Sequence, residues 1–279
     1  MADTKKRRTG QTKIFHTRVH EPPALKGIAA NLYTLQQDLE VARKIQNRLL
    51  PPKPEVEGWD FDFFYQPASE VGGDFYDFLP FDGGRLGILV ADASGKGLAG
   101  ALLMVEARAM IRAMASIASS PREILSAVNR VLLRDLDKGM FVTIFFALLD
   151  PSKNTLTMAN AGHCPMLLWR RDANEVVPHQ PRGLVLGAAT EAKFSAAIVE
   201  ETIALQPGDR FVLYSDGVPE LMNPVQEEFG MERLERWLRA NAHQASEPAM
   251  QSLISTLEMH RAGQVQSDDI TIVTGRAAP

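Results

Sequence analysis

Apolar residues recur at spacings of three and four between positions 28 and 49. This spacing predicts an amphipathic helix of about three heptads, roughly 33 Å long. Gln46 is the only polar interruption of its apolar stripe, which comprises Ile28, Leu32, Leu35, Leu39, Ala42 and Leu49. Prolines at 51, 52 and 54 predict that the helix ends near residue 52. Two interpretations stay open: a dimerising or signalling helix, or a helix packed on its own domain.

Beyond the prolines, strand-like and helix-like segments occur in groups. Short β-branched and aromatic runs predict strands over 59–65, 75–81, 86–91, 141–149, 155–159, 166–170, 195–203, 210–214 and 270–274. Longer segments predict helices over 98–116, 121–136, 231–240 and 248–262. The stretch 175–194 is punctuated by glycine and proline and stays unassigned. Grouped strands and helices favour layered α+β architecture over strict βαβ alternation.

Aspartates stand at the ends of several predicted strands. Asp92 ends an apolar run and precedes the flexible sequence ASGKG, and Asp216 follows another apolar strand within YSDG. Asp268 and Asp269 open the last predicted strand, and Asp74 follows Gly72-Gly73. One such aspartate is typical of an ordinary turn or helix cap. Four separated segments that each bring acid to a strand end favour a shared site, whose like charges would need cations to neutralise them.

The ligand types restrict which cation such a site would hold. Carboxylate oxygens are ligands for hard ions, Mg²⁺ or Mn²⁺, whereas zinc sites usually contain cysteine or histidine. Two such ions about 3.5–4 Å apart can activate water for displacement at phosphorus. The pattern therefore predicts phosphoryl chemistry that needs no protein nucleophile.

Composition narrows the class of protein further. The chain has 279 residues, 45% of them hydrophobic and 23% charged, which is ordinary for a soluble globular protein. A formal charge of −4 disfavours nucleic-acid binding. The longest apolar run, 140–149, is too short to span a bilayer. Its single cysteine, Cys164, and the absence of a signal-peptide core favour a cytoplasmic location. Residues 1–27, polar and basic, predict a flexible tail.

Six segments, taken together and in order, resemble a known family. They are DLEVARKIQNRLLP, VGGDFYDF, VADASGKG, NAGHCP, LYSDGV and SDDITIV, which span nearly everything from about residue 38 to 275. In these segments the chain resembles the metal-dependent PPM-type serine/threonine phosphatases, specifically their bacterial SpoIIE/RsbU-like branch. The resemblance implies an α–β–β–α sandwich of two antiparallel sheets over residues 53–276, preceded by a regulatory or dimerisation helix over 28–52.

The resemblance also implies a role for each matched position. Asp92 would bridge two Mn²⁺ or Mg²⁺ ions, and the backbone carbonyl of Ala93 would bind the second. Asp216 and Asp268 would hold the first ion, and Asp74 would lie near the second, through water.

Other positions are less settled by the resemblance. Asp269 would sit beside Asp268 and could exchange roles with it, and Asp77 stays open between a site role and a strand-start role. Eukaryotic relatives carry a histidine after the bridging aspartate, where this chain has Ala93-Ser94, so no leaving-group acid is identified. His163 is expected to be structural, and a Cys164-His163 nucleophile is disfavoured because neighbours on a strand point to opposite faces.

The implied function is hydrolysis of phosphoserine or phosphothreonine on a regulatory protein. By resemblance, the substrate would be a STAS-type anti-sigma-factor antagonist in a partner-switching pathway. We also expect a homodimer, and a separate activator protein that acts through residues 28–52. Two alternatives remain: a partner-binding scaffold with a weak or inactive metal site, and a metal-dependent nuclease, which the acidic charge and the missing basic stripe disfavour.

Overall fold

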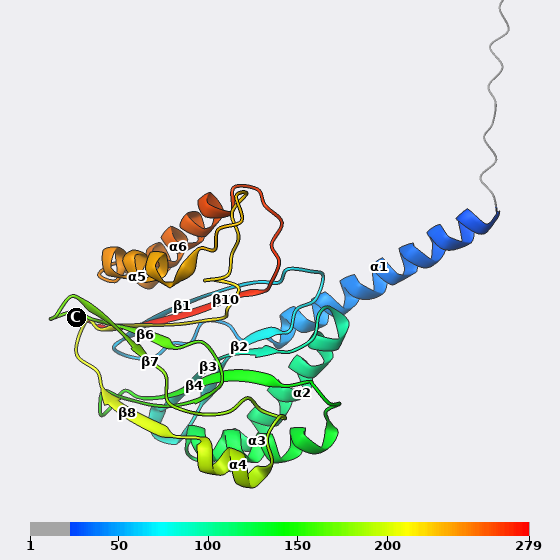
Figure 1. Cartoon of the computed structure of the whole chain (residues 1–279). Helices are drawn as coiled ribbons and strands as arrows, with labels where there is room; N and C mark the ends of the chain where they lie inside the picture. The colour runs from blue at the N-terminus through cyan, green and yellow to red at the C-terminus, as the bar shows by residue number, and fades with distance from the viewer. Residues whose placement is uncertain (1–22, 279) are drawn as a thin grey trace, which may run out of the picture. The chain divides into compact units, whose positions relative to one another are not determined.

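In the described part of the chain, ten strands form two antiparallel sheets that stack face to face (Figure 1). The computed structural model describes residues 23–278, with side chains described from residue 31. The first sheet has the order β1-β10-β9-β6-β7, formed by Trp59–Gln66, Ile270–Ala277, Arg210–Tyr214, Met166–Arg170 and Glu175–His179. The second has the order β2-β3-β4-β5-β8, formed by Asp74–Pro80, Leu86–Ala93, Val142–Asp150, Thr155–Ala161 and Glu200–Ala204.

Strand alternation separates the side chains of each sheet into two layers. On β2, Tyr76 and Phe78 point between the sheets and pack with Phe61 and Phe211 from the other sheet. Phe75, which precedes Tyr76, belongs to the core beneath the helices instead. Because successive strand residues point to opposite faces, strands covered on both faces are apolar at nearly every position.

Helices cover the outer face of each sheet (Figure 1). Helices α2, α3 and α4 pack on the second sheet, and α5 and α6 on the first. Their bounds are Leu98–Ala115, Pro121–Asp135, Glu191–Ala197, Gly230–Asn241 and Ser246–Arg261. The start of α3 is encoded locally: Ser120 Oγ accepts a hydrogen bond of 3.3 Å from the Glu123 N–H, and Pro121 occupies the first turn. The α–β–β–α sandwich expected from the sequence is confirmed.

Helix α1 spans Pro23–Leu49, so it begins before the predicted residue 28 and ends just before the prolines that were predicted to stop it near residue 52. The chain divides within it into two units, residues 1–40 and 41–279, each described by itself. Of the tail expected over 1–27, residues 1–22 lie outside the described part, as does the side chain of Ile28. In the first unit, Leu32 and Leu35 are 57% and 55% exposed. In the second unit, Ala42 and Leu49 are half-buried and Gln46 is buried.

The first part of one predicted strand is wrong. Of the strand expected over 195–203, residues 195–197 belong to helix α4, which ends at Ala197, and the strand β8 runs only from Glu200 to Ala204. Residues 191–197, EAKFSAA, include good helix formers, and this helix of about two turns is anchored by Phe194, which is fully buried in the core beneath the second sheet. The unassigned stretch 175–194 also contributes β7, a short edge strand that holds Pro178.

The stacking brings the ends of four strands together. The start of β2 and the end of β3 are neighbours in one sheet, and the end of β9 and the start of β10 are neighbours in the other. Across the two layers, β10 contacts β2 and β3, and β3 contacts β9. The segments that carry the strand-end aspartates therefore meet at one end of the sandwich. Among the described residues, no helix has both the length and the apolar composition needed to cross a membrane.

Candidate metal and phosphoryl-transfer site

Two of the predicted aspartates lie opposite each other on neighbouring strands of the second sheet. Asp74 on β2 pairs directly with Asp92 on β3, which is a destabilising arrangement for two like charges. Asp74 is 1% exposed, and its Oδ2 accepts a hydrogen bond of 2.7 Å from Thr271 Oγ1 on β10 of the opposite sheet. Burial and then the charge of Asp92 raise the pKa of Asp74 well above its ordinary value.

Three further aspartates complete the cluster from the first sheet. Asp216 follows β9, and Asp268 and Asp269 directly precede β10. The pKa of Asp92 is raised to about 7, first by burial and then by the charges of Asp216, Asp268 and Asp269. Burial and the charge of Asp268 likewise raise the pKa of Asp216. We call these five residues, Asp74, Asp92, Asp216, Asp268 and Asp269, the acidic site.

Asp268 and Asp269 are adjacent in sequence but differ in environment. Asp269 is 8% exposed and accepts three backbone hydrogen bonds, from the N–H groups of Ala68 (2.7 Å), Gly73 (2.7 Å) and Asp74 (3.3 Å). Asp268 is exposed, and only its Oδ1 accepts a bond, of 2.8 Å, from the Asp269 N–H. Asp269 therefore holds the segment before β2 in place, while Asp268 keeps oxygens free toward solvent.

Glycine is required where the backbone closes around these carboxylates. A Cβ on Gly73 would collide with the Ala93 carbonyl oxygen, and one on Gly217 would collide with the Asp269 carbonyl oxygen. The Ala93 N–H also donates to the Gly73 carbonyl at 3.2 Å. Ala93 thus lies against the segment before β2, with its carbonyl at the edge of the acidic site.

A cleft of about 470 Å³ opens beside the acidic site. Its walls include Asp92, Ala93, Asp268 and Asp269, together with the flexible loop from Ser94 to Gly97. Lys96, exposed in this loop, is the only basic residue among those that line the cleft in the described part of the chain. The cleft is large enough to admit a phosphorylated side chain.

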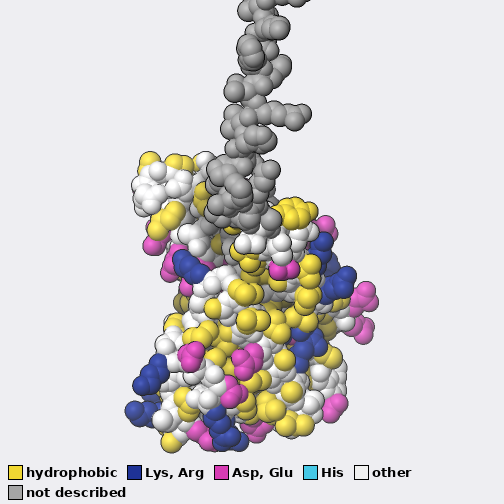
Figure 2. All heavy atoms as spheres, turned by 90° about the vertical axis from the view of Figure 1, so that its right-hand side faces the viewer, with side chains coloured by type: hydrophobic (Ala, Val, Ile, Leu, Met, Phe, Trp, Pro, Cys, Tyr) yellow, Lys and Arg dark blue, Asp and Glu magenta, His cyan; other side chains and the backbone are white. Residues whose placement is uncertain are grey.

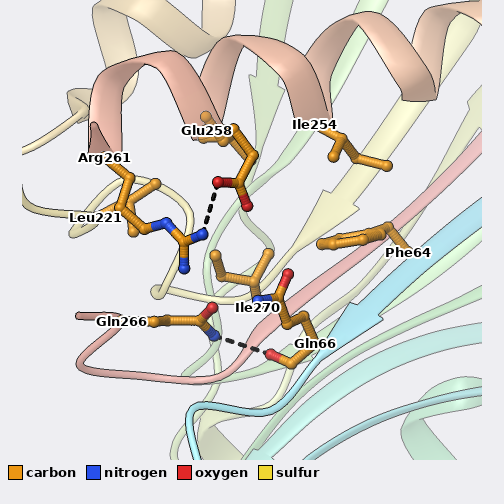
Figure 3. Close-up of a pocket in the computed structure, with 9 residues that line it drawn as sticks. Phe64, Gln66, Leu221, Ile254, Glu258, Arg261, Gln266 and Ile270 are labelled. Carbon is orange, nitrogen blue, oxygen red and sulfur yellow. Dashed lines mark hydrogen bonds and ion pairs between the residues drawn. The ribbon is translucent and has the colours of Figure 1, made fainter. Parts of the chain in front are cut away.

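A second, much smaller cavity lies between helix α6 and the strands β1 and β10 (Figure 3). Its volume of about 10 Å³ has room for about one water molecule rather than a substrate. Gln266 lines both cavities, and its Nε2 donates to the carbonyls of Gln66 (2.9 Å) and Asp268 (2.7 Å). Arg261 and Glu258 form an ion pair of 2.6 Å on the opposite wall (Figure 3). Gln266 therefore holds the Asp268 backbone from this side, and the cavity itself is too small to admit a substrate.

Asp77 lies apart from the acidic site. Three residues beyond Asp74, it points to the opposite face of β2, where Arg112 Nε and Nη2 donate to it at 2.8 and 2.9 Å. Arg108 Nε lies 3.1 Å from the same carboxylate. Burial outweighs these arginines, so the pKa of Asp77 is still raised. The structure thus gives Asp77 a contact with α2.

His163 and Cys164 are adjacent but form no nucleophile pair. His163 is buried. Its ring Nδ1 lies 2.7 Å from Thr143 Oγ1, and its backbone N–H donates to Asn160 Oδ1 at 2.7 Å. Burial lowers the pKa of His163 to about 4, so the imidazole is neutral near pH 7. Burial and then Asp216 raise the pKa of the Cys164 thiol to about 12. A protonated thiol is a weak nucleophile.

Three residues that contact the site were not predicted from the sequence. Thr271 binds Asp74, Gln266 binds the Asp268 carbonyl, and Gln46 of α1 binds the backbone of Gly72. Gln46 alone carried a signal, since it interrupts an otherwise apolar stripe. Thr271 and Gln266 sit in sequence contexts that are common in strands and loops.

With this geometry described, comparison with known proteins is informative. A family model described as Stage II sporulation protein E (SpoIIE) matches residues 82–277. The chain therefore belongs to the SpoIIE family, the bacterial branch of the PPM-type phosphatases that its motifs resemble.

Relatives and solved structures agree with this assignment. Phosphoserine phosphatase RsbU of Bacillus subtilis is 31% identical over 201 residues, which are 72% of this chain and 58% of RsbU. The structure of the SiaA-PP2C domain of Pseudomonas aeruginosa is 25% identical, covers 89% of this chain and 99% of that domain, and superposes with a TM-score of 0.79. The RsbU and RsbW domains of Rv1364c from Mycobacterium tuberculosis match at 27% identity, over 81% of this chain and 62% of that one, with a TM-score of 0.67. The chain spans 41% to 58% of the length of three curated relatives that it matches.

The charge of the acidic site predicts a pH-dependent stability. In the folded protein the pKa of Asp92 is about 7, against about 3.9 in an unfolded chain. Between these values the folded state binds a proton that the unfolded state has lost, so the free energy of unfolding falls as pH rises from about 4 to about 7. When a chelator keeps divalent cations off the protein, Asp92→Asn should reduce this pH-dependent fall in the free energy of unfolding by on the order of 2 kcal/mol. Urea unfolding at pH 4.5 and at pH 7.5 measures the free energy of unfolding at each pH.

The matched control is Asp172→Asn, because Asp172 is exposed and lies outside the acidic site. This variant should lose as much stability between the two pH values as the wild type. An equal loss in Asp92→Asn would contradict the electrostatic account of the site.

Proposed function

We propose that this chain is a divalent-cation-dependent protein phosphatase that hydrolyses phosphoserine or phosphothreonine. The observation that carries the proposal is the convergence of five aspartates, from four separate segments, beside a cleft of about 470 Å³. Membership of the SpoIIE family and the likeness to the phosphoserine phosphatase RsbU support the same reaction.

The donor set fits Mg²⁺ or Mn²⁺. Every candidate ligand is a carboxylate or carbonyl oxygen, which these hard cations prefer. Among the described residues, no three His, Cys, Asp or Glu side chains are arranged as a ready-made metal cage. Mg²⁺ usually keeps several of its waters, which would complete its coordination beside the oxygens that the protein supplies. The raised pKa values of Asp74, Asp92 and Asp216 also mark carboxylates that a cation would stabilise in their charged form.

We assign the ligands by their environments. Asp92 would be shared by two ions because it faces aspartates of both sheets, with the Ala93 carbonyl beside it. Asp216 and Asp268 would hold the first ion, and Asp74, already bonded to Thr271, would lie near the second through water. Both carboxylate oxygens of Asp269 accept hydrogen bonds from backbone N–H groups. Asp269 would therefore act chiefly by holding the segment before β2. The more exposed Asp268 is therefore the better ligand of this adjacent pair.

The bound ions would supply Lewis acidity, lowering the pKa of a water molecule and neutralising charge on the phosphoryl group. The chain itself contributes the placement of the carboxylates and the cleft that admits the substrate. His163 is buried and neutral, and the half-buried Cys164 keeps its proton beside Asp216, so neither side chain is proposed as a nucleophile. Exposed Lys96 is the residue of the cleft whose charge favours a phosphate group.

Apolar surface beside the cleft favours a protein substrate. Helix α2 begins directly after the cleft loop, and its residues Leu98, Leu102 and Val105 are 53%, 63% and 38% exposed. Figure 2, which views the side where α2 lies in Figure 1, shows apolar side chains gathered between charged ones. Apolar patches with polar rims are typical of protein interfaces. Within this family, we propose a STAS-type anti-sigma-factor antagonist as the phosphorylated partner.

The N-terminal helix suggests how the enzyme is controlled. Leu32 and Leu35 of α1 are more than half exposed, at 57% and 55%, although they belong to the apolar stripe. We propose that this stripe pairs two copies of the chain, and that a separate activator protein acts on the same helix. A cytoplasmic location would suit such a pathway.

Removing the shared ligand should abolish turnover. Asp92→Asn should lower kcat for a phosphoserine peptide in Mn²⁺ by at least about a hundredfold, because Asp92 is the carboxylate that both ions would share. Phosphate release measures the rate, and circular dichroism checks the fold. Asp82→Asn, at an exposed position after β2, serves as the matched control and should keep full activity. Normal turnover in Asp92→Asn would refute the assignment.

Negative charge introduced into the apolar stripe of α1 should dissociate the proposed homodimer. Leu32→Glu with Leu35→Glu should convert a dimer into a monomer, because the pairing would bury two like-charged side chains in each helix. Light scattering with size exclusion measures the mass. The control is Gln36→Glu with Gln37→Glu, at exposed positions off the stripe, which should leave the dimer intact. A monomeric wild-type protein at micromolar concentration would contradict the dimer.

A further inference from the structure

We propose that His260 is a positioning residue, which sets the spacing between the two loops that carry Asp216 and Asp268. His260 lies in the last turn of α6. Its ring Nε2 is 3.1 Å from the Leu221 carbonyl oxygen and 3.1 Å from the Glu227 carbonyl oxygen. Because both partners can only accept a hydrogen bond, Nε2 must carry the proton and donate to both.

The loop after β9 connects the contacts of His260 with Asp216. The Glu220 N–H donates to the Asp216 carbonyl at 2.9 Å, and the residue after Glu220 supplies the first carbonyl partner of His260. Gly217 packs on the backbone just before β10, since a Cβ at this position would collide with the Asp269 carbonyl oxygen. A short, hydrogen-bonded stretch of backbone therefore joins Asp216 to the histidine.

The loop after α6 connects His260 with Asp268. The helix ends at Arg261, and Gln266, in the loop that follows, donates to the Asp268 carbonyl at 2.7 Å. Leu221, Arg261 and Gln266 line the same small cavity, so both loops meet the end of α6 there (Figure 3). His260 is thus bonded to the loop that carries one aspartate and continuous in the chain with the loop that carries the other.

The two hydrogen bonds of His260 are not needed to satisfy the backbone of the loop. The Leu221 carbonyl also accepts from the Phe229 N–H at 2.8 Å, and the Glu227 carbonyl accepts from the Asn223 N–H at 3.0 Å. A carbonyl oxygen has two lone pairs, so His260 adds a second bond to each. Removing the donor would leave neither carbonyl without a partner, which keeps the cost in stability small. The loss would fall on the link between the loop and α6.

This link matters because the two loops carry like charges. Asp216 and Asp268 are the proposed ligands of the first ion, so the inference rests on the proposed function. The charge of Asp268 acts directly on Asp216, and such carboxylates repel unless a cation neutralises them. A histidine that ties the loops together from behind opposes this repulsion and keeps the spacing that an ion needs. Residues that orient metal ligands in this way typically change metal affinity or activity by about 10–100-fold when they are removed.

The test replaces His260 by phenylalanine, which keeps a ring edge-on to Phe229 but has no donor. In His260→Phe we expect the affinity for the tighter Mn²⁺ ion to fall about tenfold, measured by calorimetry. We expect kcat for a phosphoserine peptide to fall about tenfold, with KM changed less than about twofold, because the cleft is unaltered. Amide exchange over residues 217–229, measured by mass spectrometry in a chelator, should rise at least about threefold.

His260→Gln provides the rescue, because a glutamine Nε2 lies the same number of bonds from the backbone and still donates. This variant should keep Mn²⁺ affinity and kcat within about twofold of the wild type. The matched control is His243→Phe, the same substitution at an exposed position in the turn before α6, which should change neither. If His260→Phe fails to fold, His260→Asn carries the same expectations, because its amide is one bond too short to reach the carbonyls.

Three results would overturn the inference. The first is wild-type Mn²⁺ affinity in the folded His260→Phe variant. The second is faster exchange with unchanged Mn²⁺ affinity, because His260 would then serve only the structure of the loop. The third is an equal loss of affinity in His260→Gln, because the donor would then not be the group that matters.

The outcome is separable from that of the proposed function. A wild-type protein that binds no Mn²⁺ and hydrolyses no phosphopeptide would refute the proposed function. Amide exchange over residues 217–229 needs neither metal nor substrate, so it would still decide whether His260 holds this loop to α6.

Discussion

Repulsion between carboxylates is the constraint on which this structure depends. Five aspartates from both sheets meet at one end of the sandwich, and the pairing of Asp74 with Asp92 places two of them directly opposite each other. Burial and mutual charge raise the pKa of Asp92 to about 7. The rest of the fold offsets this cost: the inter-sheet core is rigid and apolar, Thr271 binds Asp74 across the layers, and backbone N–H groups surround Asp269. A bound cation would neutralise the remaining repulsion between the carboxylates, and this relief would favour its binding.

The alternation of strand residues sorts the charged groups by role. Asp74 points to the acidic site, whereas Asp77, three residues on, points to α2 and pairs with Arg108 and Arg112. The same strand therefore serves two purposes: one carboxylate is left without a cationic side chain and the other is given two. Asp74 and Asp77 are the same residue type on one strand, and only Asp77 has arginine partners. The lack of a cationic partner for Asp74 is therefore a feature of the fold.

Much of the fold and of the site could be predicted from the sequence because the signals are local. Strand-end aspartates, glycine turns and helix stripes are encoded within a few residues, and most predicted elements are present. The first part of the strand predicted over 195–203 was wrong because a seven-residue helix carries too few residues to show its period, and its buried Phe194 fits either pattern. The partners of Asp74 and Gln46 could not be predicted, since Thr271 and Gly72 lie 197 and 26 residues away in the chain. Such pairs are set by the stacking of the two sheets and by how α1 ends.

The central claim is that the fold gathers the five aspartates of the acidic site so that they bind divalent cations. Calorimetric titration of the full-length protein with Mn²⁺ at neutral pH, beside Asp216→Asn, tests it most directly. The account predicts saturable binding of more than one ion by the wild-type protein, and loss of the tighter event in Asp216→Asn, whose carboxylate faces Asp92 and Asp268. Absence of saturable binding at millimolar Mn²⁺, or equal binding by the variant, would contradict the account.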